Sequence, residues 1–150
     1  MKIALKMATV TLIMAGALGA CSMNTESAKK QSPLLDTTWT LVEIQSMDDS
    51  IGTATPRQGK VFSVRLTADG RATIQADCNR GGGSFKHEGN NLEFGPMATT
   101  KMYCGSDSLD SRFLKELGFV RTYVLNEGKL FMATMADGAI LEFAAVGDAD

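Results

Sequence analysis

Three cysteines and one histidine are the residues of this 150-residue chain best suited to covalent or metal chemistry: Cys21, Cys78, Cys104 and His87. Thiolates and imidazoles are common zinc ligands, but a structural zinc site usually takes four of them. The chain also lacks the Cys-x-x-Cys motif that many zinc and redox sites use. The sequence therefore predicts no metal site and no cofactor, and it favours other roles for the cysteines.

Cys21 follows a segment that is organised like a signal peptide. Lys2 and Lys6 give a positive start, residues 7–18 form a mostly apolar run, and small residues precede the cysteine. The run is shorter than the roughly 20 apolar residues that span a bilayer. The sequence Leu18-Gly19-Ala20-Cys21 resembles a bacterial lipobox, in which the cysteine becomes the first mature residue and carries a diacylglycerol and an N-acyl chain.

We therefore expect residues 1–20 to be removed and lipid to be attached to Cys21, which anchors the mature protein to a membrane without spanning it. Two or more acyl chains give stable anchoring, whereas one gives marginal binding. Ser22, in place of Asp, resembles the sorting pattern of Gram-negative outer-membrane lipoproteins, so an outer-membrane location facing the periplasm is predicted. The alternative is secretion after cleavage near Ala20, with Cys21 left as a thiol.

A flexible tether is predicted over residues 21–33, because this segment is polar and has no apolar periodicity. The folded domain is expected over residues 34–146. With 44% hydrophobic and 21% charged residues, the chain has the composition of a folded protein. Its formal net charge of -2 offers no broad basic field for a phosphate backbone, so we do not expect it to bind nucleic acid.

Once Cys21 is assigned to lipid, Cys78 and Cys104 remain as a pair. In an oxidising periplasm an even number of cysteines favours a disulfide. A bond between them closes a loop that contributes roughly 3–4 kcal/mol in the chain-entropy model. The rival interpretations are a metal site that includes His87, or a redox couple.

Other residues with chemical potential have simpler structural interpretations. Gly81-Gly82-Gly83 is not followed by the Gly-Lys-Ser/Thr of a phosphate-binding loop, so it predicts a turn or a bulge. His87 lies at a predicted hairpin tip, where an exposed turn residue is expected. Asp107 and Asp110 stand at a predicted helix start, which favours capping over paired-carboxylate catalysis. The chain is therefore not expected to be an enzyme.

Alternation of apolar and polar residues predicts a succession of short strands. They cover residues 38–44, 61–66, 71–76, 84–86, 91–94, 120–125, 129–134 and 139–145, with a further short strand within 97–102. Asp69-Gly70 between two such runs indicates a hairpin, because glycine tolerates the positive φ of these turns. One amphipathic helix is predicted after Ser106-Asp107-Ser108 by the helical spacing of Leu109, Phe113, Leu114 and Leu117.

These elements predict an α+β fold that is mostly antiparallel β, either a small curved sheet or a partly open β-barrel packed on one α-helix. Trp39, Phe62, Phe113 and Phe143 are candidates for its core. Met97, Met102, Met132 and Met135 are expected to fill gaps in that core, and an adaptable apolar binding surface is the alternative role for these methionines.

Several motifs together carry a family resemblance. They are Trp39-Thr40-Leu41, Cys78-Asn79-Arg80, Gly83-Ser84-Phe85, Leu92-Glu93-Phe94-Gly95 and Thr99-Thr100-Lys101-Met102-Tyr103-Cys104. In these the chain resembles the META domain, or HslJ-like heat-shock lipoprotein, family. The family usually has Gly before the first cysteine and an aromatic residue after Cys-Asn-Arg, where this chain has Asp77 and Gly81.

The resemblance implies a small, mostly β domain of bacterial envelope proteins that are often lipid-anchored. It also implies associations with stress or drug tolerance and no established catalytic activity. We therefore expect a non-enzymatic lipoprotein that supports outer-membrane integrity or stress tolerance by binding another envelope component. The alternative is a carrier that holds a small apolar ligand or lipid in a barrel mouth. A core filled by aromatic side chains would exclude the carrier.

Overall fold

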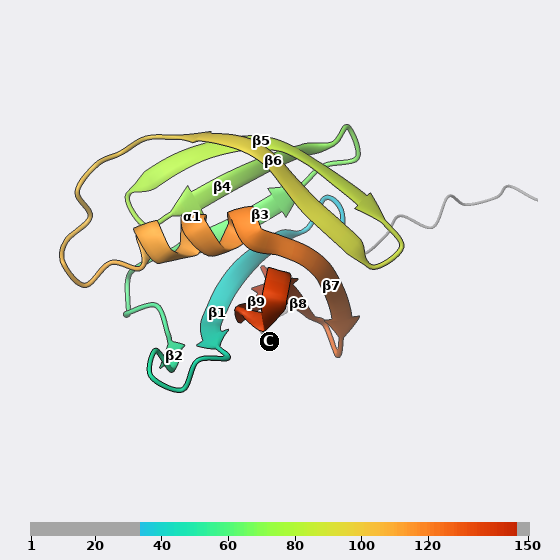
Figure 1. The fold of residues 1–150 in the computed structure, drawn as a ribbon. Coiled ribbons are helices and arrows are strands. Elements are labelled where there is room, and N and C mark those ends of the chain that lie inside the picture. Colours follow the sequence, from blue (N-terminus) through green and yellow to red (C-terminus); the bar gives the residue numbers. More distant parts are fainter. Residues whose placement is uncertain (1–33, 147–150) are drawn as a thin grey trace, which may run out of the picture. The chain divides into compact units, whose positions relative to one another are not determined.

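The computed structural model describes residues 34–146, which form a mostly antiparallel β fold with one helix (Figure 1). The predicted signal peptide, Cys21 and the predicted tether lie outside the described residues. The elements in chain order are β1 (Thr38–Ser46), β2 (Thr53–Ala54), β3 (Phe62–Leu66), β4 (Arg71–Ala76), β5 (Asn79–Glu88), β6 (Asn91–Thr99), α1 (Asp110–Phe119), β7 (Val120–Asn126), β8 (Lys129–Thr134), the 3-10 helix η1 (Met135–Asp137) and β9 (Ala139–Ala145).

The strands pair in a closed ring. The order is β2-β1-β3-β4-β5-β6-β7-β8-β9, and β1 also pairs with β9 from Trp39↔Ala145 to Ser46↔Ala139. The predicted antiparallel α+β class is confirmed, but the barrel is closed rather than partly open. Strands β6 and β7 pair only at Asn91↔Thr122, and α1 packs against β6. The helix therefore supports the ring where its backbone pairing is shortest.

Aromatic side chains fill the barrel interior. Trp39, Phe62, Phe113 and Phe143 are all buried, as the sequence predicts. The ring of Phe113, from α1, contacts Phe62 edge-on at 5.5 Å between centroids and Phe143 at 6.2 Å. The indole Nε1 of Trp39 donates a hydrogen bond of 3.1 Å to the backbone oxygen of Leu34, which is itself fully buried. Period-two alternation along the strands delivers these residues to one face, and the helix adds its own apolar stripe.

The three consecutive glycines lie inside β5, so the predicted turn is wrong, while a bulge-like register shift begins at the last of them. Gly81, Gly82 and Gly83 pair with β4 on one side and with β6 on the other. A Cβ added at Gly81 would lie 2.0 Å from the Ala98 oxygen, and one at Gly82 would lie 2.3 Å from the Ala72 oxygen. The glycines are thus needed because neighbouring backbones approach too closely for side chains. The register shift comes just after them, between Gly83 and Phe85.

The two ends of the barrel differ, because successive connections in an antiparallel ring alternate between ends. One end, here called the terminal end, holds Leu34, the turns at 67–70, 89–90 and 127–128, and Val146. The backbone amide of Asp36 bonds Leu66 there, and that of Val146 bonds Thr38. The other end, the loop end, holds the connections at 47–61, 77–78, 100–109 and 135–138. Within residues 34–146, no helix is long and apolar enough to cross a membrane.

Candidate functional site

The residues of two motifs, Cys78-Asn79-Arg80 and the segment from Thr99 to Cys104, gather at the loop end. A depression of about 670 Å³ is lined there by residues 99–106 together with Asn79, Ser108 and Asp110. Asn79 lines it from the start of β5, next to Cys78 in the short β4–β5 connection, and the other residues run from the end of β6 to the start of α1. Two parts of the sequence that are more than twenty residues apart therefore form one site.

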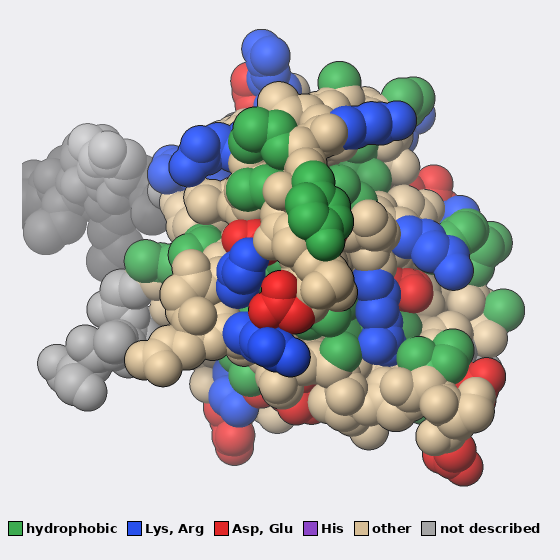
Figure 2. All heavy atoms as spheres, turned by 90° about the vertical axis from the view of Figure 1, so that its left-hand side faces the viewer, with side chains coloured by type: hydrophobic (Ala, Val, Ile, Leu, Met, Phe, Trp, Pro, Cys, Tyr) green, Lys and Arg blue, Asp and Glu red, His purple; other side chains and the backbone are tan. Residues whose placement is uncertain are grey.

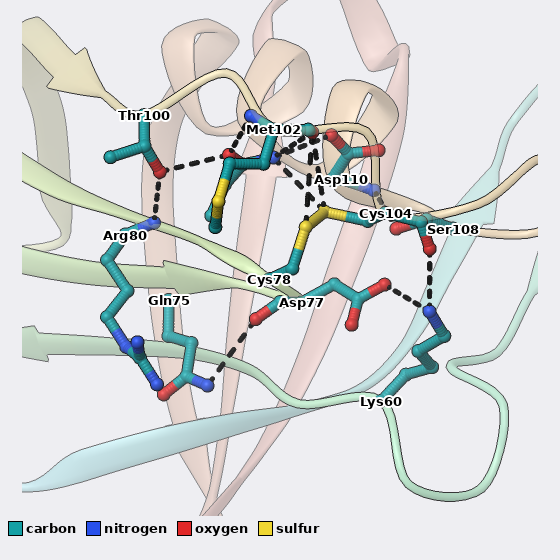
Figure 3. The surroundings of a disulfide bond; sticks show 11 residues. Lys60, Gln75, Asp77, Cys78, Arg80, Thr100, Met102, Cys104, Ser108 and Asp110 are labelled. Atoms are coloured by element: carbon teal, nitrogen blue, oxygen red, sulfur yellow. Dashed lines mark hydrogen bonds and ion pairs between the residues drawn. A yellow bond between two sulfur atoms is a disulfide. The ribbon is translucent and has the colours of Figure 1, made fainter.

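A disulfide joins these two parts. Cys78 and Cys104 are bonded, with 5.6 Å between their Cα atoms, as the sequence predicts (Figure 3). His87 lies apart from them in β5, where its ring stacks on Phe85 at 5.8 Å. Across the described part of the chain, no group of three or more His, Cys, Asp or Glu residues is placed to hold a metal ion. The covalent bond fixes the β4–β5 turn to the segment that precedes α1.

Asn79 makes the second connection between the two parts, and its side chain is buried, with only 2% of the residue exposed. Its Oδ1 accepts hydrogen bonds from the Met102 amide at 2.7 Å and from the Thr100 hydroxyl at 2.9 Å. Its Nδ2 donates to the Met102 oxygen at 3.0 Å, to Asp110 Oδ2 at 3.1 Å and to Cys104 Sγ at 3.2 Å.

The chemistry of an amide explains why asparagine occupies this position. One carboxamide supplies both an acceptor and donors, so it satisfies the amide and the oxygen of Met102 as a neighbouring strand would. Aspartate at neutral pH has no donor for the Met102 oxygen, and glutamine is one methylene longer. The motif residue Asn79 therefore fixes the backbone of the segment rather than presenting a reactive group.

Thr100 and Arg80 extend the β5–β6 pairing into the site. The Arg80 amide donates to the Thr100 hydroxyl at 3.0 Å, and the Thr100 amide donates to the Arg80 oxygen at 2.9 Å. The structure thus brings Asn79, Arg80, Thr100 and Met102 together with the two cysteines. Two other motif residues lie elsewhere, since Trp39 packs in the core near the terminal end and Gly83 is inside the β5 strand.

A charged pair at this site was not predicted from the sequence. Lys60 Nζ donates to Asp77 Oδ2 at 2.8 Å and to the Cys104 oxygen at 2.7 Å, so it connects a third segment to the disulfide (Figure 3). Asp77 has a φ of 57°, a left-handed conformation that favours glycine. The family resemblance indicates this left-handed backbone conformation, because the family usually has Gly at the position of Asp77.

The pair shifts the pKa of both groups. Burial raises the pKa of the Asp77 carboxyl, but hydrogen bonds from Lys60 and Ser108 and the charge of Lys60 outweigh it, so that the pKa lies below its ordinary value of 3.8. The hydrogen bond to Asp77 is the main cause of a raised pKa for Lys60. Both groups therefore remain charged at neutral pH.

The predicted capping by Asp107 and Asp110 is wrong, because the N-cap residue is Leu109 and neither carboxylate caps the helix; the two aspartates hold neighbouring segments instead. Asp107 forms an ion pair of 3.3 Å with Arg57, and Asp110 accepts the hydrogen bond from Asn79. The helix begins at Asp110, whose amide donates to the Ser108 hydroxyl at 3.2 Å. Ser108 thus bonds the first turn, while the two carboxylates hold neighbouring segments in place.

The side chains of the fixed segment point outward. Met102 is 55% exposed and Tyr103 is 84% exposed, and Lys101 is exposed beside them. We call residues 101–103 the tip. Figure 2 looks onto this side of the molecule and shows apolar side chains at the centre, with basic and acidic ones around them.

The predicted core role holds for only some of the methionines. Met132 is buried and Met97 packs against the core, but Met102 and Met135 are exposed. The prediction is wrong for Met102 because Asn79 binds its backbone on one side, which turns the side chain outward. Met102 instead adds its side chain to the exposed surface of the segment.

A family model described as the META domain matches residues 32–147. No curated protein matches the chain. Among solved structures, an NMR structure of a protein from Burkholderia xenovorans is 23% identical, with a TM-score of 0.62 over 77% of this chain and 89% of that one. A crystal structure of a DUF4847 family protein from Bacteroides vulgatus is 15% identical, with a TM-score of 0.51 over 71% and 90% of the two chains. At these identities the two structures show a shared fold.

Proposed function

The chain belongs to the META domain family, and on that premise we propose that it is a non-enzymatic lipoprotein whose tip binds another component of the bacterial envelope. Such binding would support outer-membrane integrity or tolerance of stress and drugs. The proposal includes a lipid on Cys21 and an outer-membrane location facing the periplasm. It depends chiefly on one observation, the exposure of Met102 and Tyr103 on a segment that is otherwise fixed in place.

Exposed apolar side chains on a fixed segment, here Met102 and Tyr103, form a surface suited to binding a partner. Large apolar side chains that stand in water favour association, and aromatic residues are frequent anchors of protein interfaces. The disulfide and the hydrogen bonds of Asn79 hold the backbone of this segment before any partner arrives. Little conformational entropy is then lost on binding, which strengthens association.

The position of the tip fits an anchored protein. The described chain begins at the terminal end with Leu34, so a lipid on Cys21 would attach upstream of that end. The tip lies at the loop end, which is the opposite end of the barrel. The tip therefore lies at the end of the barrel away from Leu34, where a partner could reach it.

The barrel interior gives no support to the alternative function, a carrier for a small apolar ligand. Phe62, Phe113 and Phe143 are fully buried and contact one another at the centre of the barrel. Leu34 and Trp39 are also buried, near the terminal end. A ligand in the barrel mouth would have to displace these side chains, which costs their packing energy.

Photocrosslinking in native membranes tests the proposal. A photoreactive benzoylphenylalanine at position 103 of the full-length chain should give a discrete crosslinked product, whereas the same group at position 124 should not. Val124 is a suitable control because it is 52% exposed but lies in β7, away from the tip. In the native host, the Tyr103→Ala variant should show the same stress sensitivity as a strain from which the gene for this protein is deleted. Equal crosslinking at both positions, or a deletion without any envelope phenotype, would contradict the proposal.

The lipid anchor has a separate test. Intact mass spectrometry of the protein purified from its host should show acylation at Cys21, and Cys21→Ser should release the protein from the outer-membrane fraction. Recovery of an unmodified Cys21 thiol would show secretion instead. That result would remove the anchor from the proposal but leave the binding role of the tip to the crosslinking experiment.

A further inference from the structure

The arginines of the chain differ in whether their side chains are engaged. All six lie within residues 34–146, and four have partners. Arg57 pairs with Asp107, Arg65 with Asp36 and Arg121 with Glu93, while Arg112 donates to the Gly52 oxygen. Arg71 and Arg80 are the two whose guanidinium groups form no ion pair or hydrogen bond with the described residues. Both side chains are exposed.

These two arginines lie on the same outer face of the barrel. Arg71 is opposite Ser84 in the β4–β5 pairing, and Arg80 is opposite Gln75. The pair Thr73↔Gly82 lies between these two rows, and Gly82 pairs in turn with Ala98 of β6. Because alternate residues of a strand share a face, Arg71 and Arg80 stand on opposite sides of the Thr73–Gly82–Ala98 row.

A hollow lies on this row between the two arginines. Its volume is about 560 Å³, and it is lined by Arg71, Thr73, Gly82, Ser84 and Ala98, among others. Gly82 has no side chain to fill it, and close contact with the Ala72 oxygen excludes any larger residue there. The lining offers hydroxyl groups and backbone but no aromatic side chain. Arg71 borders the hollow on one side, and Arg80 stands one row beyond it on the other.

We propose that this hollow binds a phosphate-bearing saccharide, with Arg71 and Arg80 holding the phosphate and the hydroxyls of Thr73 and Ser84 meeting the sugar. A free guanidinium is a planar fork that matches phosphate oxygens in two hydrogen bonds. Asp69, at the neighbouring turn, attracts Arg71 through space, but no carboxylate pairs with either arginine within 4 Å in the described structure. The hollow is therefore complementary to an anion although the whole chain is slightly acidic.

The size and lining of the hollow indicate what carries the phosphate. An inorganic phosphate would occupy a small part of about 560 Å³, so a larger molecule fits better. Beside Arg71, the lining offers the hydroxyls of Thr73 and Ser84 and open backbone but no large apolar side chain, which suits a polyol rather than an acyl chain. This site lies on the β4–β5–β6 wall, so the inference goes beyond the proposed function of the tip.

Calorimetric titration of the full-length chain in dodecyl maltoside micelles tests the inference. The probe is the phosphorylated core oligosaccharide released from lipopolysaccharide, compared with the same oligosaccharide after phosphatase treatment. We expect the dephosphorylated probe to bind at least tenfold more weakly. Arg71→Ala and Arg80→Ala should each weaken binding of the phosphorylated probe about tenfold, since each removes a charge-assisted contact. Ala98→Glu, which places a carboxylate in the hollow, should abolish it.

Matched variants separate this site from the rest of the protein. Arg57→Ala removes an exposed arginine outside the hollow and should leave the affinity unchanged, as should Tyr103→Ala at the tip. Because Arg71 and Ala98 are exposed, unchanged thermal unfolding of their variants confirms that the fold is intact. Three results would each overturn the inference: equal binding of the two oligosaccharides, binding by Arg71→Ala and Arg80→Ala as tight as that of wild type, or inorganic phosphate binding as tightly as the oligosaccharide.

Discussion

The terminal end and the loop end of the barrel are stabilised in different ways. At the terminal end, the Asp36 and Val146 amides bond the distant residues Leu66 and Thr38, but the turn at 67–70 is held by bonds between near neighbours, from the Gly70 amide to the Thr67 oxygen at 3.0 Å and from the Thr67 amide to the Arg71 oxygen at 2.9 Å. At the loop end, the main connections are long-range: 26 residues separate the disulfide cysteines, 31 separate Asn79 from Asp110, and 44 separate Lys60 from Cys104.

The two ends of the barrel therefore depend on different kinds of contact. Short turns such as 67–70 are closed by hydrogen bonds within a few residues, and these turns expose no large apolar side chain. The loop end contains longer segments that local bonding cannot fix, and cross-links between distant residues hold them. The comparison predicts that loss of the cross-links will loosen the loop end while the terminal end stays ordered.

Loss of the disulfide should have the largest effect. Closing a loop of this length is worth roughly 3–4 kcal/mol in the chain-entropy model, so the Cys78→Ala/Cys104→Ala variant should lose about that much free energy of unfolding. Urea unfolding of the full-length chain in micelles measures the loss. Hydrogen exchange should show faster exchange at residues 100–109, with unchanged protection of the amides at Thr67 and Gly70. Uniformly faster exchange at both ends would show that the two ends are not independent.

Asn79→Asp should have the next largest effect. The substitution keeps the shape of the side chain but replaces the donor Nδ2, which serves Met102 and Asp110, with an oxygen. A buried carboxylate then faces another carboxylate and a backbone oxygen, at a cost of about 2–3 kcal/mol. Asn126→Asp, the same change at an exposed position in the terminal-end hairpin, should cost less than about 0.5 kcal/mol. Equal losses in the two variants would contradict a special role for Asn79.

The same division explains what could be predicted from the sequence. The hairpin at Asp69-Gly70, the helix around Phe113 and Leu117, and the three closing strands all depend on signals within a few residues, and each is present in the structure. The disulfide was predictable because cysteine offers few alternatives in an oxidising compartment. These features need only local pattern or residue type.

Features that depend on distant residues were harder to predict. Pairing of β1 with β9 joins segments about a hundred residues apart, and no local pattern encodes it. The glycines at 81–83 predicted a turn because local sequence does not reveal how closely other strands approach. The role of Lys60 could not be predicted from neighbouring residues, because its partners, Asp77 and the oxygen of Cys104, lie far from it in the sequence. The sequence predicts a core position for Met102 because methionine is an apolar residue, and it does not reveal the hydrogen bonds from Asn79 that fix the Met102 backbone.

The ion pair at each end gives a smaller, pH-dependent comparison. Lys60→Gln removes the partner that lowers the pKa of Asp77, and the unfolding free energy should fall at neutral pH. A carboxyl whose folded pKa is depressed contributes stability above its unfolded pKa, near 3.8, and loses it as the pH falls through the folded value. Wild type should therefore lose more stability than Lys60→Gln on acidification from about pH 4 to about pH 2.

Two controls are the loss of stability at high pH, which depends on Lys60, and the Lys129–Glu142 ion pair near the terminal end. The pKa of Lys60 is raised above 10.5, so its contribution is complete below that value and is lost as the pH rises through the raised pKa. Lys129–Glu142 near the terminal end has a similar distance, 2.7 Å, but Lys129 is 51% exposed, against 26% for Lys60. Lys129→Gln should therefore destabilise the protein less, and added salt should remove more of its effect. Identical behaviour of the two variants would contradict the comparison.

The smallest change in stability is expected at the tip, where the two tyrosines of the chain provide a matched pair. Tyr103 is 84% exposed, so Tyr103→Ala should change the unfolding free energy by no more than about 0.5 kcal/mol. Tyr123 packs against the core, and Tyr123→Ala should cost about 2 kcal/mol. In native membranes the order should reverse, because only Tyr103→Ala should produce the envelope defect of a deletion while protein levels stay normal. A side chain that contributes nothing to folding but is needed in the cell must act on something outside the chain, whereas normal function of the Tyr103→Ala variant would leave the tip without a role.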